Sequence, residues 1–168
     1  MKGFTLVEII IVVSIILTLA VLGVESYAVA RRSMVIDLTT DKLVQALYSS
    51  REQAKNSAKC TGMRFETNKM PQNIEADYKN PVDGCENDFE VSSATWTKET
   101  QIYALLLDSD QKESFDVVFI PPLGQIKLPD GFKNAEIILS LKNQTNSRKI
   151  ILSSLTGKIE KLLNNATR

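Results

Sequence analysis

The feature that most constrains this chain is an apolar run that begins within its first residues and contains a single carboxylate. Residues 3–24 read GFTLVEIIIVVSIILTLAVLGV, and Glu8 is the one charged residue among them. About 20 apolar residues suffice for a helix to cross the hydrocarbon core of a membrane. A charged group there costs about 2.5–3.5 kcal/mol near the bilayer centre, and less near an edge. The run therefore predicts a membrane-spanning helix, and Glu8 predicts a functional group.

The order of segments at the start of the chain differs from that of a secretory signal. Such a signal places its small-residue cleavage site after the apolar core. Here Gly3 stands between Lys2 and the apolar run, so a cut after Gly3 would leave the run on the mature chain. That cut would give Phe4 a free amine. Glu8, four residues further on, would share a helix face with it and lie near the positive end of the helix dipole.

This segment, GFTLVE at residues 3–8, resembles the cleavage and methylation signal of type IV pilins and type II secretion pseudopilins. The resemblance implies that a prepilin peptidase and methyltransferase cuts after Gly3 and methylates Phe4. It implies that Glu8 helps to seat the subunit against the amine of a neighbouring subunit, and that an inner-membrane assembly platform builds the filament. The alternative interpretation is an ordinary membrane anchor with Glu8 at the membrane interface.

Positive charges alone do not give the orientation of the span. Lys2 precedes the apolar run, and Arg31 and Arg32 follow it. Their count does not favour a cytoplasmic N-terminus. The resemblance does favour it, because the family's peptidase acts on the cytoplasmic side. We therefore expect a single-pass protein of the bacterial inner membrane, in contact with lipid, with its outer domain in the periplasm or outside the cell.

Helical periodicity continues beyond the apolar run. One face is apolar: Ile36, Leu43, Leu47, Ala54 and Ala58. The other sides are polar: Asp37, Asp41, Lys42, Gln45, Arg51 and Glu52. These spacings predict an amphipathic helix that continues the first one to about Ser57, roughly 80 Å in all at 1.5 Å per residue. Two helices with a break at Arg31–Ser33 remain an alternative.

The rest of the chain predicts an antiparallel β domain. Short segments rich in β-branched and aromatic residues alternate with turns that contain proline and glycine. The strand candidates are 61–66, 88–96, 101–107, 115–120, 135–141 and 148–153, and Thr156–Gly157 predicts a terminal hairpin. The predicted class is α+β: a long N-terminal helix followed by an antiparallel β-sheet or sandwich, as in pilins. The expected divisions are a leader (1–3), a spanning helix (4–25), its amphipathic continuation (26–58) and the outer β domain (59–168).

Three further segments resemble the GspH/FimT-like branch of minor pilins and minor pseudopilins. They are SREQAKN (50–56), FIPPLG (119–124) and LTGKI (155–159). The middle motif is one residue longer than usual, and Lys158 stands where the branch commonly has arginine. The absence of proline before Pro71 also favours a minor pilin or pseudopilin, because many major pilins carry a helix-bending proline in the first helix.

Cys60 and Cys85 are the two cysteines of the chain. Outside the cytoplasm, two cysteines most simply form one disulfide. It would close a loop of roughly 25 residues, stabilise the fold by about 3–4 kcal/mol and fix the loop Met70–Gly84 to the end of the helix. A metal site is disfavoured, because two thiols without histidine supply only half of the ligands of zinc. The disulfide requires that the two Cα atoms lie close together.

Composition and motifs favour a structural subunit over an enzyme. The chain has no histidine, which removes the commonest general base and metal ligand. It contains no phosphate-binding loop and no nucleophile elbow. We expect no cofactor and no metal. The acidic groups at 108–113 and around Cys85 (Asp83, Glu86 and Asp88) are interpreted as solvated loop residues rather than calcium ligands.

A cluster of basic residues near the C-terminus supports an alternative function. Some minor pilins of this branch bind DNA during natural transformation, which requires a basic strip. The candidate DNA contacts are Arg148, Lys149, Lys158 and Lys161. A formal net charge of zero and the nearby Glu160 favour an ordinary charged face instead. A third hypothesis is a membrane-anchored exported domain with an unrelated binding role.

Overall fold

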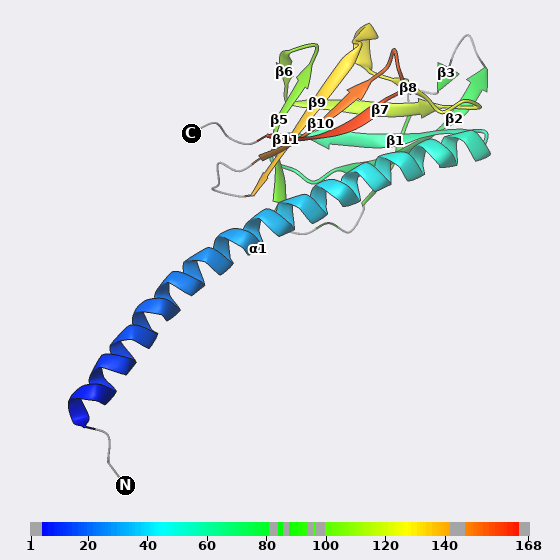
Figure 1. Ribbon diagram of the computed structural model, residues 1–168. Coiled ribbons are helices and arrows are strands. Elements are labelled where there is room, and N and C mark those ends of the chain that lie inside the picture. The colour runs from blue at the N-terminus through cyan, green and yellow to red at the C-terminus, as the bar shows by residue number, and fades with distance from the viewer. Residues whose placement is uncertain are drawn as a thin grey trace. The chain divides into compact units, whose positions relative to one another are not determined.

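The computed structural model describes residues 5–80, 84–85, 88–93, 96, 100–141 and 147–164. The fold is α+β, as predicted: helix α1 (Leu6–Asn56) precedes two antiparallel sheets (Figure 1). The chain divides into two compact units, Met1–Val35 and Ile36–Arg168. Helix α1 is continuous, as predicted, so the alternative of two helices with a break at Arg31–Ser33 is excluded.

The first unit is the apolar part of α1. Thr5 precedes the helix, and its Oγ1 accepts a hydrogen bond of 3.3 Å from the backbone N–H of Glu8. The sequence Thr-x-x-Glu is that of a capping box, which explains why the helix begins at Leu6. Ser14 and Thr18 donate their hydroxyls to carbonyls one turn earlier, so neither polar group is left unsatisfied.

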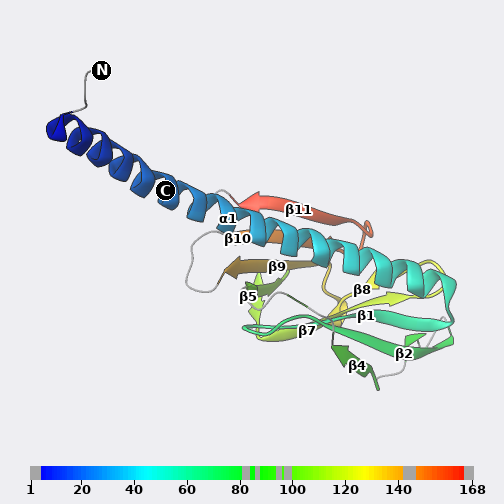
Figure 2. The same ribbon diagram turned by 90° about the horizontal axis from the view of Figure 1, so that it is seen from below.

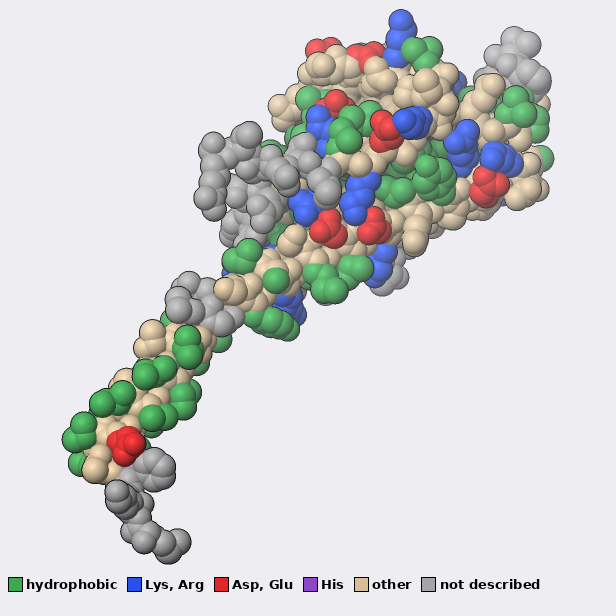
Figure 3. Space-filling model, in the orientation of Figure 1, with side chains coloured by type: hydrophobic (Ala, Val, Ile, Leu, Met, Phe, Trp, Pro, Cys, Tyr) green, Lys and Arg blue, Asp and Glu red, His purple; other side chains and the backbone are tan. Residues whose placement is uncertain are grey.

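Apolar side chains of this unit are exposed on all sides of the helix. Hydrophobic side chains line the visible face of its N-terminal part in Figure 3. The large apolar residues from Leu6 to Val13 are all exposed, and together they cover every side of the helix. By length and composition the helix could cross a membrane. In water, a helix that is apolar all round is stable only when it is buried, so these residues need a lipid or protein environment.

The second unit contains the remainder of α1 and two sheets. Its strands are β1 (Lys59–Glu66), β2 (Gln72–Asn80), β3 (Gly84–Cys85), β4 (Glu90–Ser93), β5 (Thr100–Leu107), β6 (Asp110–Lys112), β7 (Ser114–Ile120), β8 (Gln125–Lys127), β9 (Asn134–Leu141), β10 (Ser147–Ser153) and β11 (Ile159–Asn164). One sheet has the order β3-β2-β1-β7-β8, with β4 also paired to β2. The other has the order β11-β10-β9-β5-β6. Every paired strand is antiparallel.

One core joins α1 to both sheets, and Figure 2 shows the helix lying across them in this unit. Ile36, Leu43, Leu47 and Ala54 are fully buried, as the helical spacing predicted. The placement of Ala58 on this face was wrong, because α1 ends at Asn56 and Ala58 is exposed. Three hydroxyl residues lie on the same buried face: Thr39, Thr40 and Ser50.

The six predicted strands are all present, with shifted ends, and the terminal hairpin forms between β10 and β11. The predicted loop Met70–Gly84 was wrong, since most of it is β2, which pairs with β1 on one side and with β3 and β4 on the other. The alternating burial of its residues (Ile74 and Ala76 buried, Asn73 and Glu75 half-buried) is that of a strand.

Candidate functional site

Of the residues predicted to act in processing and assembly, the structure places only Glu8. Gly3 and Phe4 lie outside the described residues. Glu8 lies in the first turn of α1 and is exposed. Its backbone N–H is bonded to Thr5, and its carboxylate forms no hydrogen bond or ion pair with any residue of the described ranges. The carboxylate is therefore free, within the described chain, to pair with a group from another molecule.

The predicted disulfide is present. Cys60 and Cys85 are bonded, with Cα atoms 5.9 Å apart, and they join β1 to β3. Cys60 is fully buried, beside Ile74, Ala76 and Val118 in a small second apolar cluster. The disulfide thus links two strands of the first sheet, and it does not fix a loop to the helix as predicted.

Replacing both cysteines by serine should lower the free energy of unfolding by about 3–4 kcal/mol, because the bond constrains a loop of 25 residues in the unfolded chain. Guanidinium unfolding of the full chain in detergent micelles measures this difference. The parent protein treated with a reductant should unfold at the same midpoint as the variant. An unchanged midpoint in both would show that the disulfide contributes nothing.

The terminal hairpin contacts α1 along a line of polar side chains, which we call the hairpin seam. Its helix residues are Asp37, Asp41, Tyr48 and Arg51, and its hairpin groups are Arg148, Lys161 and the carbonyls of Gly157 and Ile159. The helix residues are spaced by four, seven and three positions, so they form one stripe beside the apolar face.

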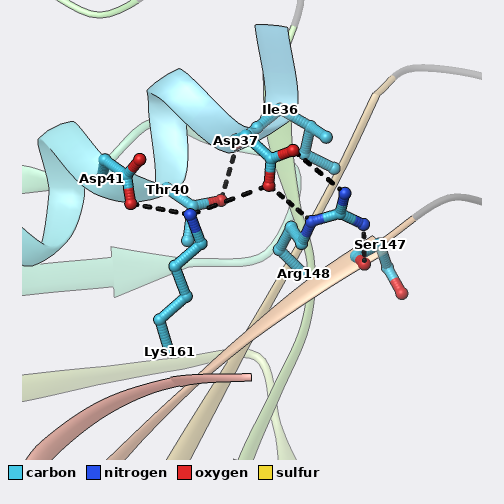
Figure 4. Close-up of polar contacts among 7 residues, drawn as sticks. All are labelled: Ile36, Asp37, Thr40, Asp41, Ser147, Arg148 and Lys161. Atoms are coloured by element: carbon cyan, nitrogen blue, oxygen red, sulfur yellow. Dashed lines mark hydrogen bonds and ion pairs between the residues drawn. The ribbon is translucent and has the colours of Figure 1, made fainter. Parts of the chain in front are cut away.

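Charged groups occupy one end of the hairpin seam (Figure 4). Arg148 donates from Nε and one terminal nitrogen to the two oxygens of Asp37, at 2.7 and 3.1 Å. Lys161 Nζ lies 2.7 Å from Asp41 Oδ1 and 3.7 Å from Asp37 Oδ1. A bidentate arginine–carboxylate pair fixes direction as well as distance. Two cations and two carboxylates therefore hold β10 and β11 in one register on the helix.

The ion pair between Asp37 and Arg148 shifts the pKa values of both residues. The hydrogen bonds and charge of Arg148, with that of Lys161, lower the pKa of Asp37 from its ordinary value of 3.8, although partial burial opposes this. Asp37 also raises the pKa of Arg148. Because the Asp37 pKa is lower in the folded than in the unfolded chain, its stabilisation is present above the unfolded pKa and is lost as the pH falls through the folded pKa.

Acid should therefore destabilise the parent protein more than an Asp37→Asn variant. We expect the free energy of unfolding of the parent to fall faster from about pH 5 downwards, because only the parent must protonate this carboxylate. Thermal unfolding followed by circular dichroism at a series of pH values gives the two slopes. Asp110→Asn, at the exposed start of β6, should retain the slope of the parent. Equal slopes for the parent and Asp37→Asn would contradict the role of the pair.

The four candidate DNA contacts all lie on β10, β11 or the turn between them, and each is paired with a carboxylate. Arg148 and Lys161 belong to the hairpin seam. Lys149 contacts Glu136 of β9 at 2.8 Å, and Lys158 contacts Glu160. A phosphate would have to displace these carboxylates, so the hairpin does not offer an unpaired basic strip. DNA binding by these residues stays a prediction.

Arg51 joins the three segments that resemble the GspH/FimT-like branch. Its Nε donates to the carbonyl of Gly124 at 3.0 Å, and a terminal nitrogen donates to the carbonyl of Gly157 at 2.9 Å. Both glycines have positive φ, 62° and 65°, and a Cβ at either one would come within about 3 Å of the Arg51 side chain. The two turns thus need glycine for backbone conformation and for space. Sequence reasoning did not identify this role of Arg51.

Acidic residues of the described ranges do not form a metal site. No three Asp, Glu or Cys side chains there are grouped as metal ligands. Asp108 accepts hydrogen bonds from the backbone N–H groups of Lys133 and Asn134, at 2.9 and 2.8 Å, and so ties the β5–β6 turn to β9. Asp83 and Glu86 lie outside the described residues.

Comparison of the chain with known proteins gives no relative: no family model, no curated protein and no solved structure matches it.

Proposed function

We propose that this chain is a minor pilin or pseudopilin, a structural subunit of a type IV pilus or type II secretion filament, and not an enzyme. The observation that carries the proposal is Glu8, one exposed carboxylate in the first turn of a helix whose following residues are apolar and exposed on all sides. The segment GFTLVE, which resembles a prepilin processing signal, surrounds it.

The chemistry of this helix suits assembly with like helices. Before assembly the apolar part of α1 crosses the inner membrane, with its N-terminus in the cytoplasm. In the filament, neighbouring helices take the place of lipid around the same side chains. The carboxylate of Glu8 then pairs with the methylated amine of Phe4 in the next subunit, because a charged group in apolar surroundings needs a partner. Such head-to-tail contacts do not close, so they build a fibre.

The second unit is suited to be the exposed part of the subunit. Its β sheets, disulfide and hairpin seam hold the second half of α1 in one folded body. A disulfide of this kind is stable in the periplasm or outside the cell. The partners of the chain in this proposal are the prepilin peptidase, the inner-membrane assembly platform, lipid and other pilin or pseudopilin subunits.

The intact mass of the protein from the membranes of its own host tests the proposal. We expect a mass that lacks Met1–Gly3 and carries one methyl group on Phe4. A Gly3→Leu variant made in the same host is the control and should keep its full N-terminus, because the residue before the cut is changed. A parent chain that still begins at Met1, in a host that contains the peptidase, would contradict the proposal and leave a simple membrane anchor.

A further inference from the structure

The apolar part of α1 is followed by an aromatic residue and two arginines. Tyr27 is 70 % exposed, and Arg31 and Arg32 are exposed as well. Tyr27 and Arg31 are four residues apart, so they share a helix face. All three belong to the first unit, Met1–Val35.

The distance between Tyr27 and the start of the helix matches the thickness of a bilayer. Leu6 and Tyr27 are 21 positions apart in the sequence, which is about 32 Å along an α-helix. The hydrocarbon core of a membrane is about 30 Å thick. When Glu8 lies near one interface, Tyr27 reaches the other, where tyrosine is enriched in membrane proteins because its ring is apolar and its hydroxyl is polar.

The two arginines lie about one further turn along, at the depth of lipid headgroups. Neither forms an ion pair with any carboxylate whose side chain the structure describes. Asp37, the next carboxylate along the chain, is already held by Arg148. Glu25 is the one acidic residue between the apolar run and Arg31, so the two guanidinium groups leave a net positive charge in this segment.

We propose that Arg31 and Arg32 bind the phosphate groups of anionic phospholipids, in the leaflet at the C-terminal end of the span, while the subunit resides in the membrane. The inference rests on the membrane span of the proposed function. Guanidinium groups suit this partner because their planar donors match two phosphate oxygens at once. With Tyr27 at the interface, the pair fixes the depth of the helix in the bilayer. Anionic lipid then gathers around the subunit.

The test is lipid selectivity of the full chain reconstituted in phosphatidylcholine bilayers. Electron spin resonance with spin-labelled phosphatidylglycerol or phosphatidylcholine reports which lipid is immobilised at the protein. We expect the parent to prefer phosphatidylglycerol by about fivefold, since each arginine near the surface favours an anionic lipid. The Arg31→Gln/Arg32→Gln variant should lose the preference. The matched control Lys42→Gln/Lys59→Gln removes two exposed positive charges of the second unit and should keep it.

Four results would overturn the inference. Equal immobilisation of both lipids by the parent would show that the arginines do not select phosphate headgroups. Loss of selectivity in the lysine control would assign it to overall charge. Loss of the lipid preference when millimolar inorganic phosphate is added would show that the two arginines bind free phosphate rather than lipid headgroups. Extraction of the parent by alkaline carbonate would show instead that the helix does not span a bilayer, and in that case the proposed function fails with it.

Discussion

Replacing Glu8 by leucine is expected to abolish incorporation of the chain into filaments while the chain remains folded. If Glu8 pairs with the amine of a neighbouring subunit, its removal leaves that amine buried and unpaired. Truncation of one member of such a pair costs about 2–5 kcal/mol, so incorporation should fall by about 30-fold or more. Immunoblotting of sheared filaments against the membrane fraction of the host measures the ratio.

Two control variants separate assembly from folding. Ser14→Leu also places a leucine in the apolar run, and it should assemble as the parent does. Unfolding of Glu8→Leu should change by less than about 0.5 kcal/mol, because Glu8 is exposed and the second unit does not include it. Glu8→Asp should retain part of the incorporation into filaments, since the negative charge is kept. Normal filament levels of Glu8→Leu would refute the pairing.

The second large effect is expected from Phe119→Ala. Phe119 lies on β7, is fully buried and belongs to the core that joins α1 to both sheets. Loss of a buried phenylalanine removes transfer free energy and leaves a cavity, which together cost about 3–5 kcal/mol. For a domain of this size the Tm should fall by about 10–20 °C. Thermal unfolding of the full chain in detergent micelles is the measurement.

Leu123→Ala is the matched control for Phe119→Ala. Leu123 belongs to the same FIPPLG segment, yet it is 65 % exposed, at a turn. Its loss should change the free energy of unfolding by less than about 0.5 kcal/mol. A similar Tm for both variants would mean that the segment does not pack as the structure shows. A decrease in Tm confined to Phe119→Ala would support the packing of Phe119 in the core.

The helix and most strands could be predicted because each depends on a local pattern. Leucine and isoleucine at helical spacing give the buried face of α1 whatever packs against it. The hydroxyls of that face could not be assigned in the same way. Thr40 is buried because its hydroxyl is bonded to the Ile36 carbonyl at 2.7 Å within the same helix. That local bond makes a polar residue acceptable in the core, and a hydropathy pattern does not record it.

Strand β2 was missed because the strands that pair with it are what make it a strand. Its sequence, QNIEADYKN, contains charged residues and few β-branched ones. The backbone pairs with β1 on one side and with β3 and β4 on the other, and these pairings outweigh the weak local preference. The segment Met70–Gly84 was therefore interpreted as a loop.

The candidate site also has a part that the sequence predicts and a part that depends on distant residues. The basic residues of the terminal hairpin were identified in the sequence, but their partners were not. Asp37 and Asp41 were assigned only to the polar side of the helix, more than a hundred positions from Arg148 and Lys161. A single sequence contains no signal that such distant residues meet. Which carboxylate neutralises which cation is decided by the topology of the second sheet.

The hairpin seam also sets the order in which this protein can be completed in the cell. Its hydrogen bonds join residues 106 to 120 positions apart. At a synthesis rate of about 5–20 residues per second, the polar stripe of α1 waits about 6–24 s for its hairpin partners. During this time Asp37 and Asp41 lack their cations. A chain that stops before Arg148 has no hairpin to pair with these two carboxylates.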